Sequence, residues 1–419
     1  MTNKMSALHL TSEWNRPYLP TGGAEKVSLL IEARGNGEVQ LSRAPLNLSL
    51  VLDRSGSMSG SSLEYSKRAC QFVIDQMQEQ DLLNMVAFDE EVITVFEPQR
   101  VTHKDMMNQK VAAIHSGGCT NLSGGLIQGA QYVKRNNQEG MVQRVILLSD
   151  GHANEGIVDR NKLAAIAKEY NHSRIGITTI GLGDGFDEEL MEGIADGGGG
   201  NFYYVEKPDD IPGIFAKELQ GLLSVVAQHV HLTVKPADNV QVTRVYGYDA
   251  VSNDKSLDIK LGDLYHQEVK SLLLEVSFYP HTAGSHPILE LEWNYIDVTE
   301  TAVECRITQS VQAEFTNDID LLNQSPNIEV EKQVQITASA LAIEEAMKDF
   351  DSGDFESGKY KLKTQADQLL AMAVTADDAQ LREESAMLYQ KLENFEYSAA
   401  TRKQLHNQKY RQMKRKMNE

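Results

Sequence analysis

Short apolar runs that alternate with helical segments between residues 46 and 227 constrain the fold of this chain more than any other feature. The runs carry apolar side chains at nearly every position, so the strands they form are buried on both faces. Such strands occur in parallel sheets whose two faces are covered by helices. The sequence therefore predicts a doubly wound, mostly parallel α/β sheet, with strands that include 46–52, 82–88, 144–149 and 175–182.

The segments on either side of this unit show a period of two residues. Val27, Leu29, Ile31 and Ala33 recur at every second position, and the same alternation returns in 228–315. This pattern is typical of antiparallel strands with one face in water. Because the N-terminal strands have no other obvious partner, we expect them to pair with the later strands. The α/β unit would then be inserted into an antiparallel β-sandwich.

From residue 316 onward the pattern is helical. Ile336, Ala340, Ile343 and Met347 follow one another at spacings of four and three, which places them on one face of a helix. We expect three or four helices, packed as a C-terminal bundle. Together these patterns predict sandwich strands at 1–42, the α/β unit at 43–227, the remainder of the sandwich at 228–315, and a helical region with a basic tail at 316–419.

Charge and cysteine content exclude several classes of protein. The formal net charge of −20 disfavours nucleic acid and anionic membranes as partners, because phosphates repel an acidic surface. Three widely spaced cysteines, none in a CxxC pair, favour a reducing compartment over a disulfide framework or a thiolate zinc site. The N-terminus lacks the apolar core of a signal peptide, and no apolar run is long enough to span a membrane. We therefore expect a cytoplasmic protein.

Side chains that carry oxygen follow several of the expected strands and helices. The first apolar run ends at Asp53, and Ser55 and Ser57 follow at a two-residue spacing in VLDRSGSMSG. Thr120 lies in the glycine-rich stretch SGGCTNLSGG, and Asp150 directly follows the apolar run RVILLS. In a doubly wound sheet, such loops meet in the crevice beyond the carboxyl ends of the strands. Oxygen ligands suit hard cations, so we interpret these side chains as a cup for Mg²⁺, with Mn²⁺ or Ca²⁺ as alternative ions.

Other interpretations of the same residues stay open. A DxSxS stretch can cap a helix without any metal. Ser57 or Ser149 near His152 could belong to a Mg²⁺-dependent hydrolase, although a third member of a triad is missing. The eleven histidines form no HxxxH or HExxH pair, so zinc hydrolysis has no support. A structural scaffold with an unoccupied metal site is the remaining alternative. We expect a binding protein and not an enzyme.

The three motifs resemble the metal-ion-dependent adhesion site of von Willebrand factor type A (VWA) domains. Asp53, Ser55 and Ser57 match the family motif DxSxS. Thr120 matches the distal threonine of that site in GGCTNL, and Asp150 matches its distal aspartate in SDG. All five positions are filled in the family's order, and the stretch TTIGLGDGFDEELMEGIADGGGGNFYYVE is similar to soluble bacterial members.

The resemblance covers residues 45–227 and implies both a fold and a function. It implies a Rossmann-like VWA domain that binds other proteins, in which an Asp or Glu of the partner completes the shell of a Mg²⁺ ion. It also implies a scaffold or adaptor in a cytosolic multi-protein assembly, with an AAA+ ATPase of the MoxR type or a kinase–phosphatase set as partner. The sequence itself does not choose between these partners.

Two positions depart from the family pattern, and the tail is unusual. Arg54 fills the first x of DxSxS, where small or acidic residues are common, and its guanidinium could favour an acidic partner or cover the site. Cys119 precedes Thr120, and we expect it to be a small buried residue, with a redox sensor as the alternative. The tail 402–419 carries seven Lys or Arg residues and one Glu. It is either a solvated helix end or a docking segment for an acidic surface.

Overall fold

The computed structural model describes residues 7–36, 44–138, 140–150, 152–183, 185–299, 302–393 and 397–414. The chain forms two compact units. The α/β unit comprises residues 38–229 and 297–303, and the sandwich unit comprises 1–37, 230–296 and 304–419. The beginning and the end of the chain therefore fold together, while most of the segment between them builds a unit of its own.

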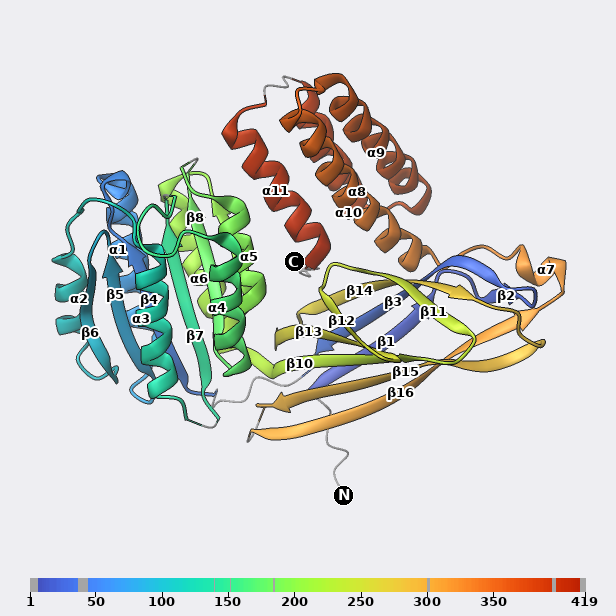
Figure 1. Ribbon diagram of the computed structural model, residues 1–419, viewed down its shortest axis with the longest axis horizontal. Coiled ribbons are helices and arrows are strands. Elements are labelled where there is room, and N and C mark those ends of the chain that lie inside the picture. Colours follow the sequence, from blue (N-terminus) through green and yellow to red (C-terminus); the bar gives the residue numbers. More distant parts are fainter. Residues whose placement is uncertain are drawn as a thin grey trace. The chain divides into compact units, whose positions relative to one another are not determined.

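A six-stranded sheet forms the centre of the α/β unit (Figure 1). Its strand order is β6 (Val92–Arg100), β5 (Leu82–Phe88), β4 (Leu46–Asp53), β7 (Val142–Ser149), β8 (Gly176–Leu182) and β9 (Gly199–Val205). Neighbouring strands run parallel, except that the edge strand β6 is antiparallel to β5. Strand β4 lies in the interior, with Leu52 level with both Ala87 and Leu148. Strand order reverses beside β4, so a crevice is expected beyond its carboxyl end.

Helices cover both faces of this sheet (Figure 1). Leu50 of β4 belongs to one apolar cluster with Val73 and Phe215. Its neighbour Val51 faces the opposite side, where a Cβ added to Gly129 would lie only 2.4 Å from the Val51 side chain. Burial on both faces explains the continuous apolar runs. One face carries α1 (Ser61–Gln76), α2 (Lys104–Ala112) and α6 (Ile211–Leu223), and the other carries α3 (Leu122–Arg135), α4 (Arg160–His172) and α5 (Glu188–Gly198).

The sandwich unit contains two sheets. The first has the order β1 (Leu8–Trp14), β3 (Ala24–Gly35), β14 (Val269–Phe278) and β11 (Val240–Tyr246). The second has the order β12 (Ala250–Asn253), β13 (Ser256–Tyr265), β10 (Val225–Pro236), β15 (Gly284–Asp297), β16 (Val303–Thr316) and β2 (Tyr18–Pro20).

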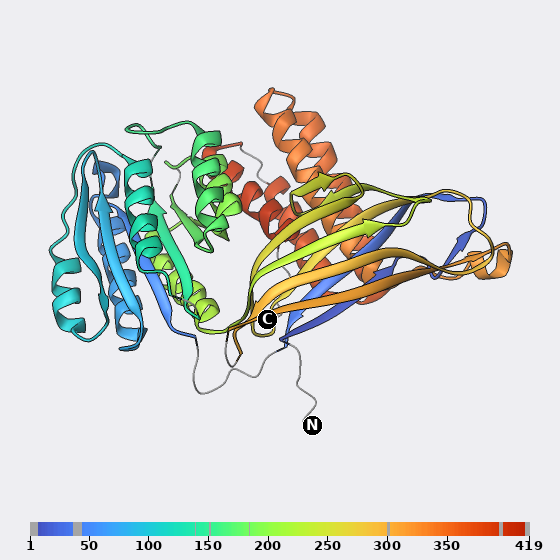
Figure 2. The same cartoon turned by 60° about the horizontal axis from the view of Figure 1, so that its bottom comes forward.

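Strands from the two ends of the chain pair within these sheets. Leu29 of β3 lies opposite Leu274 of β14 in an antiparallel ladder, and Leu19 of β2 pairs with Phe315 of β16. Figure 2 shows the N-terminal strands in blue beside the later strands in yellow and orange. The predicted fold class is confirmed: a mostly parallel α/β sheet is inserted into antiparallel β structure, and helices follow.

In the described part of the chain, four long helices and one short one make up the C-terminal segment. Helix α8 packs against α9 and α11, and α9 packs against α10. Val330 at the start of α8 contacts the sandwich through an apolar cluster with Leu30 and Leu273. The last residues of the basic tail, 415–419, lie outside the described residues. The helices are α7 (Ile319–Leu322), α8 (Ile328–Asp351), α9 (Phe355–Ala376), α10 (Ala379–Glu393) and α11 (Ala399–Lys414).

Two shorter turns of 3₁₀ helix, η1 (Gly56–Met58) and η2 (Pro208–Asp210), lie in the α/β unit. Among the helices that the structure describes, none combines the length and the apolar character needed to cross a bilayer.

We expect a chain that begins at residue 43 to aggregate. It lacks β3, so β14 would present an unpaired edge of backbone N–H and carbonyl groups to other chains. Size-exclusion chromatography and thermal melting measure the effect, and a chain that begins at residue 7 serves as the control because it keeps β1 to β3. A soluble monomer with an unchanged melting temperature would contradict the shared sheet.

Candidate functional site

The loop that follows β4, residues 53–57, starts from a buried carboxylate. Asp53 is the last residue of β4 and is fully buried. Its Oδ1 accepts a 2.8 Å hydrogen bond from the backbone N–H of Ser55, and its Oδ2 accepts one from the hydroxyl of Ser149 at the end of β7. Both carboxylate oxygens therefore have donors, and the side chain is fixed at the junction of the two strands.

Hydroxyl groups connect Asp53 to the second acidic residue. Ser55 Oγ lies 3.2 Å from Ser57 Oγ, and Ser57 donates a 2.7 Å hydrogen bond to Asp150 Oδ1. Ser55 and Asp150 are buried, whereas Ser57 is exposed. Four of the five predicted site residues thus form one hydrogen-bonded series, with access from solvent at Ser57.

Thr120 is placed by the backbone of its loop, residues 115–121. The N–H of Gly56 donates to the carbonyl of Gly118 at 2.9 Å, which joins this loop to the loop after β4. Asn154, from the loop after β7, accepts from the N–H of Thr120 at 2.7 Å and donates its own N–H to the Thr120 carbonyl at 3.2 Å. Three loops therefore meet at the carboxyl end of the sheet, with Thr120 buried between them.

Helix capping does not account for these side chains. Helix α1 begins at Ser61, and its N-cap residue is Gly60, which has no side chain that could cap the helix. The N-cap of α3 is Asn121, whose side chain accepts from the N–H of Gly124. The predicted site residues are therefore not needed to cap either helix, and their oxygens are available for another role.

The two carboxylates lie in an environment that disfavours their charged forms. Burial raises the pKa of Asp53 to about 6; hydrogen bonds from Ser149 and Ser55 oppose the increase, and the charge of Asp150 adds to it. Burial also raises the pKa of Asp150. No basic side chain contributes to either shift. Buried carboxylates are costly unless a cation compensates them, so this pair suits a bound metal ion.

The chemistry of the donor set fits a small divalent cation. Two carboxylates and three hydroxyls supply only oxygen atoms, which Mg²⁺ prefers, and Mg²⁺ usually keeps several waters beside its protein ligands. No group of three or more His, Cys, Asp or Glu side chains suited to a metal occurs among the described residues. A metal site at this position would therefore depend on the hydroxyl groups.

Two residues beside the cup depart from the family pattern, and the structure shows the surroundings of both. The side chain of Arg54 is only 17% exposed, and its guanidinium lies 2.7 Å from the buried carboxylate of Asp89. Its guanidinium is therefore engaged by a partner within the chain. Cys119 is exposed, so the prediction of a small buried residue is wrong. Its backbone N–H donates to the carboxylate of Glu90 at 2.8 Å.

Sequence patterns did not identify Ser149, Asn154 or Asp89 as supports of the metal cup. Ser149 and Asn154 lie close in sequence to Asp150, and this proximity is the only sequence feature that could have identified them as supporting residues. The contact between Asp89 and Arg54 joins two different strand ends, so no local pattern reveals it. Ser149 and Asn154 hold the predicted ligands Asp53 and Thr120 directly, whereas Asp89 acts through Arg54 and the loop backbone.

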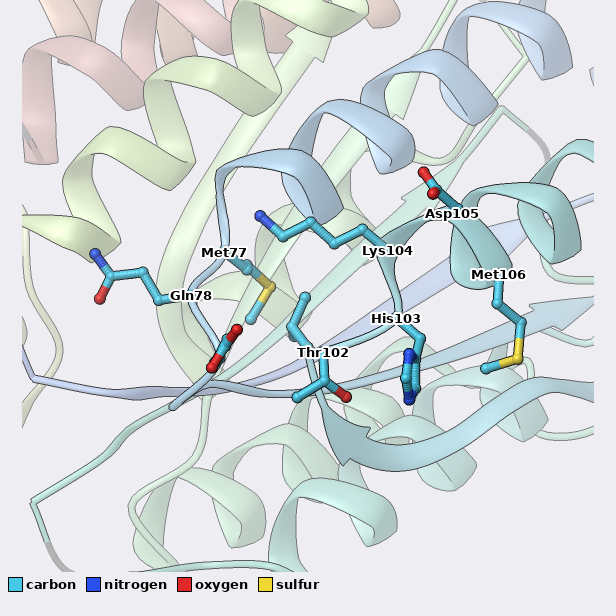
Figure 3. A pocket seen from close by; sticks show the side chains of 9 residues that line it. Met77, Gln78, Thr102, His103, Lys104, Asp105 and Met106 are labelled. Carbon is cyan, nitrogen blue, oxygen red and sulfur yellow. The ribbon is translucent and has the colours of Figure 1, made fainter.

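A separate hollow lies at the opposite end of the same sheet (Figure 3). It lies where α1 ends and α2 begins. This is the amino end of β5, whose first residue, Leu82, pairs with Arg100, the last residue of β6. Lys104 in its lining donates to the carbonyl of Asp75 at 2.7 Å. None of the predicted site residues lines it. Its volume is about 930 Å³, and its lining comprises Met77, Gln78, Glu79, Val101, Thr102, His103, Lys104, Asp105 and Met106.

Residues 47–217 match the von Willebrand factor type A domain family. The chain is 31% identical over 266 residues to protein sll0103 of Synechocystis, and this match covers 61% of the chain and 62% of that protein. It is 25% identical over 260 residues to YfbK of Escherichia coli, covering 60% of the chain and 44% of that protein. The chain thus spans less than two thirds of the length of these relatives.

Two solved structures share the fold over nearly the whole chain. A von Willebrand factor type A protein from Catenulispora acidiphila has a TM-score of 0.78 at 16% identity and covers 100% of this chain and 99% of its own. The ArnB paralog VWA2 from Sulfolobus acidocaldarius has a TM-score of 0.65 at 16% identity and covers 98% of both chains. The α/β unit, the sandwich and the C-terminal helices therefore recur together as a fold.

We expect Asp53→Asn to stabilise the metal-free protein at neutral pH. The folded pKa of Asp53, about 6, exceeds the usual 3.8, so the folded state holds its proton more tightly than the unfolded state does. Protonated Asp53 therefore contributes to the free energy of unfolding. This contribution is complete below the pKa of the unfolded state and is lost as the pH rises through the pKa of the folded state. The charged side chain then costs on the order of 3 kcal/mol, which the asparagine avoids.

Thermal melting in EDTA measures this effect. The advantage of Asp53→Asn over the natural protein should be small at pH 4 and should grow up to pH 7. Asp238→Asn is a suitable control, because Asp238 is exposed and its ion pair with Lys255 lies on the surface. An advantage of Asp53→Asn that does not change with pH would contradict the assignment.

Proposed function

The chain carries a von Willebrand factor type A domain at residues 47–217, and from this we propose that it is a Mg²⁺-dependent protein-interaction module and not an enzyme. Asp53, Ser55, Ser57, Thr120 and Asp150 would hold the ion, some directly and others through water. VWA domains generally mediate adhesion and protein interaction, which supports a binding role. Mn²⁺ and Ca²⁺ are alternative ions.

The pair of buried carboxylates is the observation that carries this proposal. Asp53 and Asp150 lie at the two ends of the hydroxyl series. No basic group among the described side chains contributes to the pKa shift of either one. A bound Mg²⁺ would supply a positive centre with a position open to a further oxygen ligand. Among the described residues the cup holds two carboxylates, so the bound ion would stay electrophilic and attract a carboxylate from outside.

The cup is also placed where a partner can reach it. Ser57 is exposed while the other four side chains are buried, so the entrance lies on the loop after β4. An Asp or Glu on a protein partner could enter there and complete the shell. Ser149 is one of the two serines considered for a hydrolase. Its hydroxyl donates a hydrogen bond to the carboxylate of Asp53 and not to a histidine base. This contact favours binding over nucleophilic catalysis.

The partner and the place of the protein in a larger assembly are further parts of the proposal. We infer a scaffold or adaptor role in a multi-protein assembly. An AAA+ ATPase or a kinase–phosphatase set remains the prediction that rests on family resemblance alone. The matched relatives are longer than the matched segment, so their whole-protein roles do not transfer directly.

Asp150→Ala should abolish Mg²⁺ binding and leave the fold intact. The side chain lies on a loop beyond β7 and not in the apolar core, and its removal also relieves repulsion with Asp53. Isothermal titration should show at least a roughly 100-fold loss of Mg²⁺ affinity, because even residues outside the ligand shell often cost ten- to a hundred-fold. Circular dichroism serves as the control for folding. Wild-type affinity in the variant would contradict the site.

A partner captured with Mg²⁺ and released by EDTA should depend on one of its own acidic residues. Asp150→Ala and removal of that partner residue should each weaken binding by similar amounts, and the combination should add little, because both act through one contact. The expected coupling is on the order of 2–4 kcal/mol. Additive effects would show that the ion does not touch the partner. Mg²⁺-dependent turnover of phosphoesters by the purified protein would instead favour the hydrolase.

A further inference from the structure

We propose that Arg54 and Asp89 are positioning residues for the cup: their ion pair fixes the loop of Thr120 against the loop after β4 and thereby adapts the cup to Mg²⁺ in preference to Ca²⁺. This inference rests on the proposed metal site. Neither residue is among the five predicted ligands, and both act through the loops that carry them.

Arg54 is tied to its surroundings by both its backbone and its side chain. Its backbone N–H donates to the carbonyl of Phe88 at 2.8 Å, and its carbonyl accepts from the N–H of Gly117 at 2.7 Å. Its Nη2 lies 2.7 Å from Asp89 Oδ2, and its Nη1 donates to the carbonyl of His115 at 3.3 Å. A single residue therefore links the loop after β4 to the loop after β5 and to both ends of the segment 115–117.

Asp89 holds the same loop from the other side. Its carbonyl accepts from the N–H of Asn121 at 2.8 Å, one residue after Thr120. Its carboxylate is 4% exposed and fills the space above Gly117, where an added Cβ would lie 1.7 Å from Asp89 Oδ2. Only glycine leaves room for the ion pair at that position. The contacts at Gly117 and Asn121 lie on either side of Thr120 along the chain.

The ion pair therefore sets the position of the backbone that carries the Thr120 hydroxyl. Arg54 itself stands between Asp53 and Ser55, so its backbone contacts to Phe88 and Gly117 hold the chain between two predicted ligands. The pair also compensates the buried charge of Asp89, whose carboxylate lies against Gly117 of the same loop. We infer that this buried ion pair contributes more to a defined arrangement than to net stability.

Precise placement matters more for Mg²⁺ than for Ca²⁺. Mg²⁺ requires a nearly octahedral set of ligands at short distances, whereas Ca²⁺ accepts more ligands, longer distances and irregular geometry. Loosening the loop of Thr120 should therefore weaken Mg²⁺ binding more than Ca²⁺ binding. A role in stability alone would not change the ratio of the two affinities.

The test compares the affinities of the full-length protein for Mg²⁺ and for Ca²⁺ by isothermal titration. The main variant is Arg54→Met/Asp89→Asn, which removes both charges and leaves no buried charge unpaired. The matched control is Lys255→Met/Asp238→Asn, which removes an exposed ion pair in the sandwich unit and leaves no other partner unpaired. Arg54→Lys is the conservative variant, since it keeps the charge beside Asp89 but loses the planar fork that also reaches His115.

We expect the main variant to lose roughly tenfold or more in Mg²⁺ affinity and clearly less in Ca²⁺ affinity, as is typical when residues that orient ligands are removed. Arg54→Lys should lose less, and the control should match the wild type. If the main variant does not fold, Arg54→Lys alone decides the test, again by comparing its loss of Mg²⁺ affinity with its loss of Ca²⁺ affinity. Wild-type Mg²⁺ affinity in the deciding variant, or equal losses for both ions, overturns the positioning role and leaves the metal site standing. A wild-type protein that binds neither ion overturns both.

Discussion

The burial of Asp53 at the end of strand β4 is the constraint on which the rest of the α/β unit depends. A carboxylate at this depth is unfavourable unless its oxygens have donors and its charge has a partner. Ser55 and Ser149 supply the donors. The chain brings a second carboxylate, Asp150, toward the same place, and no basic side chain contributes to the pKa shift of either one. A divalent cation would compensate both charges, which no basic side chain among the described residues is seen to do.

The sheet topology explains why the loops can converge. Strand β4 pairs with β5 on one side and β7 on the other, so the loops after all three strands leave the sheet at the same edge. Gly56 and Gly118 then allow backbone contact between the loop after β4 and the loop that carries Thr120. All of these contacts lie within the α/β unit, which has its own apolar core.

Much of the fold could be predicted because burial leaves a direct trace in the sequence. Continuous apolar runs predicted strands covered on both faces, and the alternation around Leu29 predicted an antiparallel strand that joins the later strands; the structure pairs it with β14. Four of the five predicted ligands lie at or just beyond the ends of β4 and β7, which share one edge of the sheet, whereas Thr120 lies on the loop between α2 and α3. The exposure of Cys119 and the pairing of Arg54 with Asp89 were not predictable in this way. Both depend on how loops from different strand ends pack, and no local period records that packing.

A diffraction experiment on crystals grown with Mn²⁺, which can replace Mg²⁺ in oxygen sites, tests the central claim most directly. An anomalous difference map locates the ion independently of any assumed ligand. The account predicts one strong peak between Asp53, Ser55, Ser57, Thr120 and Asp150, with at least one water or an outside carboxylate in its shell. A map with no peak in the cup, or with its main peak elsewhere in the α/β unit, would contradict it.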